Sequence, residues 1–269
     1  GVFLLITALL GQAAMADWAW RIPFLSSFVL VAIGLYVRLK LTEAPIFIAA
    51  LNKPKPKALP MMEVIVTHFK PFFLGMLICM AGYVLFYIMI AFSQIYAKSA
   101  PTVSEAGYAM GLGFSPQIFT ALLMCSAISL AITIAISGKY IDIVGRRIWL
   151  IWTTVAVAIF GLALPYFLEN GTTVSLFWFL IIGMGLIGMG YGPLSSFLPE
   201  LFPTHVRYTG ASLTYNIAGL FGASVAAIIA LPLNANYGLK GVGIYLTLNA
   251  VLSLIGLWFI TETRDRQLL

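Results

Sequence analysis

Long, predominantly apolar stretches recur along the whole chain, and they constrain its fold more than any other feature. Examples are residues 22–41, 148–168 and 241–260. A helix needs about 20 such residues to cross the ~30 Å hydrocarbon core of a bilayer. Only 9% of the residues are charged, whereas soluble domains carry about 25%. The sequence therefore predicts an all-α polytopic membrane protein.

Eight apolar segments can be delimited, and the first is short for a complete crossing. They cover residues 1–16, 22–41, 71–97, 114–137, 148–168, 174–198, 209–231 and 241–260. The chain starts with Gly1, inside an apolar run and without the basic region of a signal peptide. We therefore expect a fragment that begins within a membrane span. Tight turns are expected at residues 17–21 and 234–240.

The longest polar stretch covers residues 42–70 and is expected to be a linker. Its centre alternates three lysines with two prolines over residues 53–57. Proline lacks a backbone N–H and disfavours a helix interior, so this centre is expected to be extended. Residues 61–69 are expected to form a short interfacial helix.

The basic residues divide unequally between the two sides of the membrane. Because successive spans alternate in direction, one side receives 12 of the 15 Lys and Arg residues and the other side receives Arg21, Lys98 and Lys240. The positive-inside rule assigns the richer side to the cytoplasm. The linker and the C-terminus are then expected to be cytoplasmic. Since these bases are scattered over short loops, the net charge of +6 does not indicate nucleic-acid binding.

A ten-residue polar island at residues 138–147 separates the fourth and fifth apolar segments. It reads GKYIDIVGRR and combines two glycines, one acid and three bases. Glycine permits a sharp turn and a close approach to a neighbouring helix. The arginines can bind a carboxylate or a lipid phosphate. We expect this island to be a cytoplasmic turn.

These motifs resemble the major facilitator superfamily of transporters. The island is similar to the superfamily's signature loop through Gly138, Asp142, Gly145, Arg146 and Arg147. Residues 199–210, PELFPTHVRYTG, are similar to a link found in sugar porters and metabolite:proton symporters. Residues 43–45 and 262–264 resemble the acidic motifs that close each half, and residues 18–24 look most like the metabolite:proton symporters.

The resemblance implies a domain layout. Residues 1–41 would end the N-terminal half as a partial helix plus one full span. Residues 42–70 would be the cytoplasmic linker, residues 71–261 the C-terminal six-helix bundle and residues 262–269 a cytoplasmic tail. The N-terminal half of the same protein would then be missing from this sequence, and we expect the fragment alone not to transport.

The charged residues on the predicted cytoplasmic face suggest a gate. An acid beside the island needs a partner such as an arginine or a helix N-terminus. We expect these residues to form a charge cluster that closes the inner side in one conformation and breaks on rocking; its members are Glu43, Gly138, Asp142, Gly145, Arg146, Arg147, Glu200, Arg207 and Glu262. The alternative is a set of solvated residues that only mark topology.

Polar residues inside the apolar segments are candidates for a substrate cavity, because buried polar groups in a membrane are costly unless used. Tyr83, Tyr87 and Gln94 share one helical face, and Asn216 with the neighbouring Tyr215 marks another. Gln117 and Asn249 are weaker candidates. The alternatives are packing or interfacial anchoring for the tyrosines and an interhelical hydrogen bond for Asn216.

Other features indicate no separate chemistry. The glycine-rich run at residues 183–193 lacks the strand and lysine of a nucleotide loop, so we expect close helix packing there. Cys79 and Cys125 lie on different spans and are expected to be buried thiols. His68 and His205 lie on separate connectors. We expect no metal, no cofactor and no catalytic residue.

The sequence is therefore interpreted as part of a secondary active transporter for a small organic acid or zwitterion in a bacterial inner membrane. Its expected partners are a small metabolite, protons and the lipid bilayer. No acid lies in the middle of a complete span, so proton coupling is implied by the resemblance alone. The alternatives are a sugar-porter-like carrier and a non-transporting membrane sensor or scaffold on the same fold.

Overall fold

The computed structural model describes residues 2–40 and 59–262, and it separates the chain into two units, Gly1–Lys55 and Pro56–Leu269. The described residues contain helices, turns and one isolated bridge between Val103 and Ala109, with no longer strand. Six helical segments are long and apolar enough to cross a membrane. The prediction of an all-α polytopic membrane fold is confirmed.

The first unit consists of two helices joined by a π-helical turn. Helix α1 spans Val2–Ala14, the turn spans Met15–Ala19 and α2 spans Arg21–Lys40. The expected tight turn at residues 17–21 is therefore mostly helical. Arg21 stabilises the junction, because its guanidinium donates to the carbonyl of Asp17 at 3.2 Å and lies 4.6 Å from the ring centre of Trp20.

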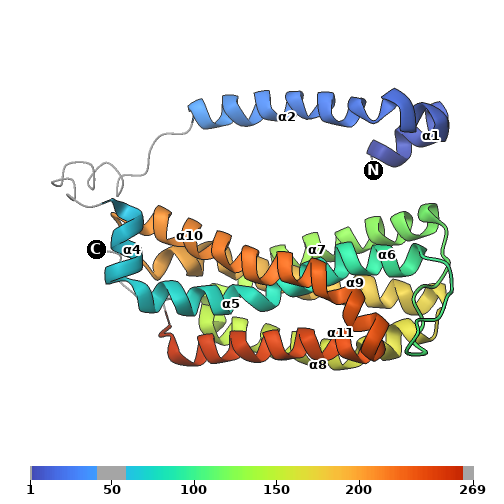
Figure 1. Ribbon diagram of the computed structural model, residues 1–269. Coiled ribbons are helices and arrows are strands. Elements are labelled where there is room, and N and C mark those ends of the chain that lie inside the picture. The colour runs from blue at the N-terminus through green and yellow to red at the C-terminus, as the bar shows by residue number, and fades with distance from the viewer. Residues whose placement is uncertain (1, 41–58, 263–269) are drawn as a thin grey trace. The chain divides into compact units, whose positions relative to one another are not determined.

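The second unit is a helical bundle whose long helices lie side by side (Figure 1). It begins with the short α4, Pro60–Thr67. Helix α5, Phe69–Tyr87, continues through the π-helical turn Ile88–Phe92 into α6, Ser93–Lys98. The remaining helices are α7 (Pro116–Val144), α8 (Arg146–Glu169), α9 (Thr173–Glu200), α10 (Arg207–Gly219) and, after a π-helical turn, α11 (Val225–Phe259).

The segment Arg207–Phe259 provides two crossings although it is helical almost throughout. Its 53 residues exceed twice the length that one crossing needs. Gly238 breaks it with φ 68° and ψ −171°, a conformation that side chains with a Cβ rarely adopt. Figure 1 shows that α11 consists of two parts that run in opposite directions. The expected turn at residues 234–240 is thus a one-residue break. With this break, the described part of the second unit contains six segments long enough to cross a membrane.

The structure departs most from the sequence-based expectation at the polar island, residues 138–147. Helix α7 continues to Val144, so residues 138–144 are helical and the only break before α8 is Gly145. Hydrophobicity indicates where a span leaves the membrane, whereas a helix ends only where its backbone hydrogen bonds end. Similarly, α9 reaches Glu200 and α10 begins at Arg207, so only residues 201–206 separate the helices that correspond to the sixth and seventh apolar segments.

Close packing between α7 and α9 depends on glycines. A Cβ at Gly188 would clash with the Oγ1 of Thr133 and lie 2.6 Å from the carbonyl oxygen of Leu130. The hydroxyl of Ser129 on α7 donates to the carbonyl of Ile181 on α9 at 3.0 Å. Small residues let two backbones approach closely, and hydroxyls then bond across the interface. The expectation that the glycine-rich run serves helix packing is confirmed.

Helix α11 is held to two neighbours by similar means. Gly243 lies against the carbonyl of Gly161 on α8, where a Cβ would clash, and nearby Thr247 donates to the carbonyl of Ala158 at 3.1 Å. On the α5 side, the hydroxyl of Ser253 donates to the carbonyl of Leu77 at 2.6 Å. These contacts fix the position of α11 relative to α8 and α5.

The short helix α4 is docked onto one end of this bundle. Its Val64 is fully buried in a cluster with Phe202 and Val206. The neighbouring Glu63 lies 2.6 Å from the Nε2 atom of His205, measured from its Oε1 atom. The last part of the predicted linker is therefore packed on the bundle, while residues 41–58 lie outside the described residues.

Candidate functional site

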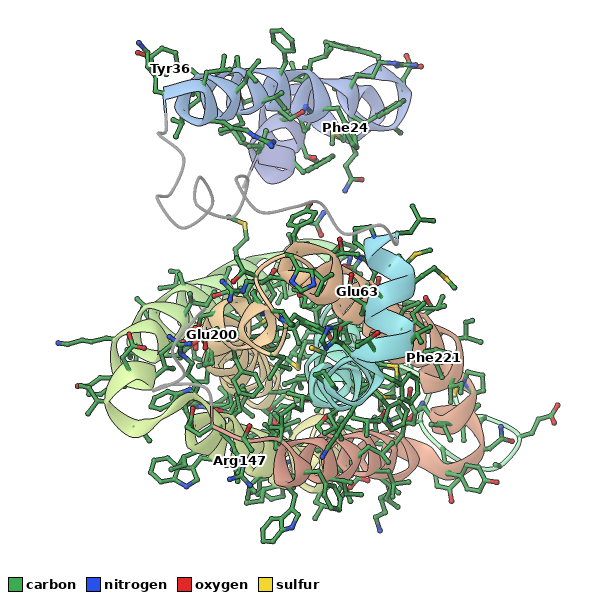
Figure 2. All side chains as sticks on the ribbon, turned by 90° about the vertical axis from the view of Figure 1, so that its left-hand side faces the viewer. Phe24, Tyr36, Glu63, Arg147, Glu200 and Phe221 are labelled. Carbon is green, nitrogen blue, oxygen red and sulfur yellow. The ribbon has the colours of Figure 1, made fainter. Side chains whose placement is uncertain are left out.

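Charged side chains gather where α7 ends, α8 begins and α9 ends. We call Asp142, Arg146, Arg147, Glu200 and Glu262 the charge cluster. Figure 2 looks onto this end of the bundle, with Arg147 and Glu200 labelled. Members separated by more than one hundred residues in the sequence meet here, so the cluster is a product of the tertiary fold.

Arg146 is the centre of the charge cluster. Its guanidinium forms an ion pair with Glu200 and a second with Asp142 at 3.4 Å. The side chains of Arg146 and Glu200 are only 15% and 14% exposed, whereas that of Asp142 is 68% exposed. A pair withdrawn from solvent is screened less than an exposed one. The contact between Arg146 and Glu200 is therefore the strong one, and it joins α8 to the end of α9.

Glu262 caps the N-terminus of α8. Its two carboxylate oxygens accept from the backbone N–H groups of Arg146 at 3.1 Å and Arg147 at 3.0 Å. The first N–H groups of a helix have no partner within the helix, and the helix dipole favours negative charge there. Gly145, with φ 101°, makes this possible, since a Cβ would lie 2.9 Å from the Oε2 atom of Glu262.

Arg147, at the start of α8, contacts the C-terminal end of α11. Its Nε atom donates to the carbonyl of Leu257 at 2.7 Å, and its Nη2 atom donates to that of Trp258 at 3.1 Å. The last carbonyls of α11 are unpaired within the helix and carry partial negative charge, so a guanidinium stabilises them. The start of α8 and the end of α11 are consequently joined from both sides.

Two other described members of the predicted gate, Arg207 and Gly138, lie outside this arrangement. Arg207 donates within its own link, to the carbonyl of Phe202 at 3.5 Å and to the hydroxyl of Thr204 at 3.4 Å. Gly138 is exposed, with open space where a Cβ would be. Glu43 lies outside the described residues.

Replacing Glu262 by alanine is expected to lower the free energy of unfolding by about 1 kcal/mol, because removal of a capping side chain typically costs that amount. Glutamine at the same position retains an oxygen acceptor but loses the charge, so it should cost less. Chemical unfolding of the purified full-length protein in detergent measures both. Glu105→Ala, an exposed loop substitution, is the control, and an equal effect of all three would contradict the capping role.

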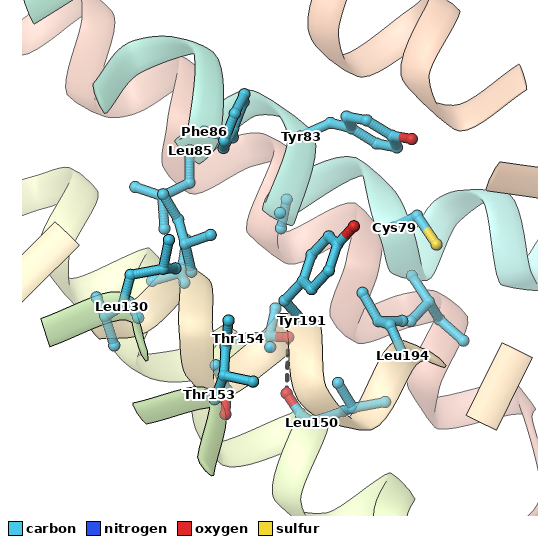
Figure 3. A pocket seen from close by; sticks show the side chains of 18 of the residues that line it. Cys79, Tyr83, Leu85, Phe86, Leu130, Leu150, Thr153, Thr154, Tyr191 and Leu194 are labelled. Atoms are coloured by element: carbon cyan, nitrogen blue, oxygen red, sulfur yellow. Dashed lines mark hydrogen bonds between the residues drawn. The ribbon is translucent and has the colours of Figure 1, made fainter. Parts of the chain in front are cut away.

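A cavity of about 280 Å³ lies within the second unit, between α5, α7, α8, α9 and α10. Figure 3 shows Tyr83 from α5, Tyr191 from α9 and Thr153 and Thr154 from α8 around it. Tyr215 from α10 also lines it. The ring centres of Tyr83 and Tyr215 are 4.9 Å apart. Concave, mostly apolar pockets with a few convergent polar groups are typical of small-molecule sites.

Of the seven residues predicted for a substrate cavity, Tyr83 and Tyr215 line this one. Tyr87 packs against the core, and Asn249 is buried with its amide donating to the carbonyl of Tyr245 at 2.8 Å. Asn216 is exposed on α10 and donates to the carbonyl of Ser212 at 2.8 Å. The other two, Gln94 and Gln117, are also exposed.

Sequence reasoning missed four polar residues that line the cavity: Cys79, Thr153, Thr154 and Tyr191. Cys79 lies one turn before Tyr83 on the same helical face, which was a usable signal. Tyr191 lies inside the glycine-rich run, which was interpreted as packing. The two threonines follow the polar island by about two turns and resemble ordinary residues of an apolar span, so no local pattern marks them.

Comparison with known proteins supplies the family. The sequence profile of the Major Facilitator Superfamily matches residues 1–227. A protein of Haemophilus influenzae, provisionally named as a metabolite transport protein, is 87% identical over 268 residues, which is 100% of this chain and 60% of that protein. The inner membrane metabolite transport protein YhjE of Escherichia coli K12 is 40% identical over 269 residues, with the same two coverages.

A proline/betaine transporter of Escherichia coli K12 is 27% identical over 280 aligned residues, which is 100% of this chain and 53% of that protein. No solved structure shows significant similarity to the chain. The chain thus spans between about half and 60% of the length of these relatives. The apolar, membrane-length helices of the described residues and the profile match over residues 1–227 establish that the chain is an integral membrane protein belonging to the Major Facilitator Superfamily.

Proposed function

We propose that the protein is a secondary active transporter that takes up a small zwitterion or organic acid by alternating access. The observation that carries this proposal is the cavity between five membrane-spanning helices, which is lined by tyrosine and threonine side chains. Polar side chains within spans mark substrate paths. The names of the relatives, metabolite transport protein and proline/betaine transporter, support the same class of substrate.

In this proposal the described second unit is the C-terminal half of the carrier. Residues 1–41 end the N-terminal half, residues 42–70 link the halves and residues 262–269 form the tail. The name of YhjE supports a location in a bacterial inner membrane. The charge distribution in the loops supports a cytoplasmic C-terminus.

The charge cluster is proposed to stabilise one of the two states of the carrier. It joins the start of α8 to the end of α9 through Arg146, and to the end of α11 through Arg147 and Glu262. Alternating access is largely a rocking or gating of bundles against one another, and charge pairs that are formed in one state and broken on rocking favour the first state. Proton coupling belongs to the proposal as well, and its support is the likeness to metabolite:proton symporters.

Uptake by the full-length carrier that contains this sequence tests the proposal. Right-side-out vesicles from expressing cells would be given a labelled zwitterion, a dicarboxylate or a hexose under an imposed, inwardly directed proton gradient. We expect one of the first two to accumulate above equilibrium and a protonophore to abolish the accumulation. Residues 1–269 alone, reconstituted in the same way, serve as the control and should not accumulate substrate.

Preference for the hexose would replace this proposal with a sugar carrier. Accumulation that is unaffected by the protonophore would remove proton coupling and leave transport in place. Failure of all three substrates in vesicles with verified expression would count against transport of this class.

A further inference from the structure

The cavity is chemically unusual for a site that would hold an ionised metabolite. None of the described residues that line it carries a charge. Its walls are largely aliphatic, with Ile78, Leu130, Val157, Ile187 and Leu194 among them. A carboxylate placed here would lose its hydration without meeting an arginine or lysine, which is costly. The end of the substrate that enters this half must therefore tolerate a neutral, apolar environment.

Few of the polar groups around the cavity are available to a ligand. The hydroxyl of Thr153 donates to the carbonyl of Trp149 at 3.0 Å, and that of Thr154 donates to the carbonyl of Leu150 at 2.7 Å (Figure 3). Each hydroxyl therefore already donates its only proton to a carbonyl of its own helix. The remaining polar side chains are the thiol of Cys79 and the phenols of three tyrosines.

The three tyrosines form one aromatic group on the cavity wall although they come from three helices. Tyr83, Tyr191 and Tyr215 all line the cavity. The rings of Tyr83 and Tyr215 meet at 51° with 4.9 Å between their centres. Phe86 adds a fourth ring to the lining. We call Tyr83, Tyr191 and Tyr215 the tyrosine wall.

We propose that the tyrosine wall recognises the onium end of a zwitterion, an alkylated ammonium group, while the carboxylate of the same substrate is bound outside this cavity. This inference rests on the proposed transport function and narrows its substrate class. Aromatic faces are electron-rich and attract cations, most strongly when water is excluded. An alkylated ammonium also presents methyl or methylene groups, which suit aliphatic walls.

Two competing substrate ends fit this lining less well. A primary ammonium has three strong N–H donors, and leaving such donors unpaired in an apolar site is costly. The described lining side chains offer hydroxyl and thiol groups but no carboxylate or amide oxygen. A dicarboxylate would bring a negative charge against the negative faces of the rings. The lining therefore favours a cation that has no need of hydrogen-bond acceptors.

Two ligands of the same shape isolate the contribution of the positive charge. Trimethylglycine and 3,3-dimethylbutanoate both carry a carboxylate, but the trimethylammonium of the first is a neutral tert-butyl group in the second. Binding to the purified full-length carrier would be measured by calorimetry. We expect trimethylglycine to bind roughly tenfold more tightly than its neutral isostere, as a desolvated cation–π contact implies, and more tightly than glycine or succinate.

Variants then assign this preference to the tyrosine wall. Tyr215→Leu and Tyr191→Leu remove an aromatic face and should reduce the ratio of the two dissociation constants severalfold, whereas Tyr215→Phe retains the ring and should preserve it. Tyr191 is 52% exposed, so its substitution is the one least expected to disturb folding. Tyr166→Leu, at an exposed position outside the cavity lining, is the matched control.

The outcomes separate this inference from the proposed function. Equal binding of the isosteres, preference for succinate, absence of binding, or a ratio unchanged in both leucine variants would overturn the tyrosine wall as an onium site. Uptake of an organic acid would then leave the transport proposal intact. Conversely, tight binding of trimethylglycine that depends on the tyrosines, without uptake in vesicles, would support the site and contradict transport.

Discussion

Replacement of Gly243 by alanine is expected to lower the free energy of unfolding by about 3 kcal/mol or more, because the added methyl group has no space. The Cβ would clash with the backbone carbonyl oxygen of Gly161, which cannot rotate away as a side chain could. Helices α8 and α11 would have to separate. That movement would also stretch the 3.1 Å hydrogen bond from Thr247 to the carbonyl of Ala158.

Alanine at Gly138 is the control, because this substitution should not lower the free energy of unfolding. Gly138 lies in α7, and no heavy atom lies within 4 Å of the position that a Cβ would take. Alanine stabilises a helix interior by about 1 kcal/mol relative to glycine. Gly138→Ala should therefore leave stability unchanged or slightly raised. Unfolding of both variants in detergent by a chemical denaturant measures the difference, and equal effects would show that the contact between α8 and α11 adjusts freely.

Replacement of Arg146 by methionine is expected to cost about 3 kcal/mol, because removing one partner of a largely buried ion pair leaves the other charge poorly compensated. The affected carboxylate is that of Glu200, whose side chain is 14% exposed. Asp142→Asn should cost less than about 1 kcal/mol, since Asp142 is 68% exposed and exposed pairs contribute little.

A double substitution tests whether the two side chains act as a pair. In Arg146→Met with Glu200→Leu, no largely buried charge is left without its partner, because Asp142 is 68% exposed and remains solvated. Replacing both members of a buried pair by apolar groups is often nearly neutral. The double variant should therefore be more stable than Arg146→Met alone, and a cycle of unfolding measurements gives the coupling. If the losses in unfolding free energy of the two single variants simply add in the double variant, the pairing is contradicted.

Uptake by the same double variant tests the proposed role of the charge cluster in transport. If the cluster stabilises one state of the carrier, the double variant should be stable but slow in uptake, because the balance between the two states has changed. Uptake at the rate of the unsubstituted carrier would restrict the pair of Arg146 and Glu200 to a structural role.

Local sequence patterns predicted some parts of the candidate site and could not predict others. Tyr83 and Tyr215 were identified because polar residues stand out within apolar spans. Tyr191 was not, since its surroundings of glycines favoured a packing interpretation. The helical continuation of α7 through residues 138–144 was missed because polarity was equated with a turn. The break at Gly145, in contrast, follows directly from the residue type that a positive φ requires.

The sequence by itself determined the class of the protein, because apolar length and charge distribution act locally. A segment of about 20 apolar residues enters a bilayer whatever its neighbours are, and basic residues orient it independently of the packing that follows. The signature motif around Asp142 and Arg146 likewise identified the superfamily from consecutive residues.

Only the tertiary structure decided which side chains meet. Arg146 and Arg147 were predicted to have acidic partners, but the separate tasks of Glu200 as an ion-pair partner and Glu262 as a helix cap depend on how α8, α9 and α11 pack. The convergence of three tyrosines on an uncharged cavity depends on the same packing. Contacts between residues far apart in the sequence arise from the mutual fit of whole helix surfaces, and no local pattern encodes that fit.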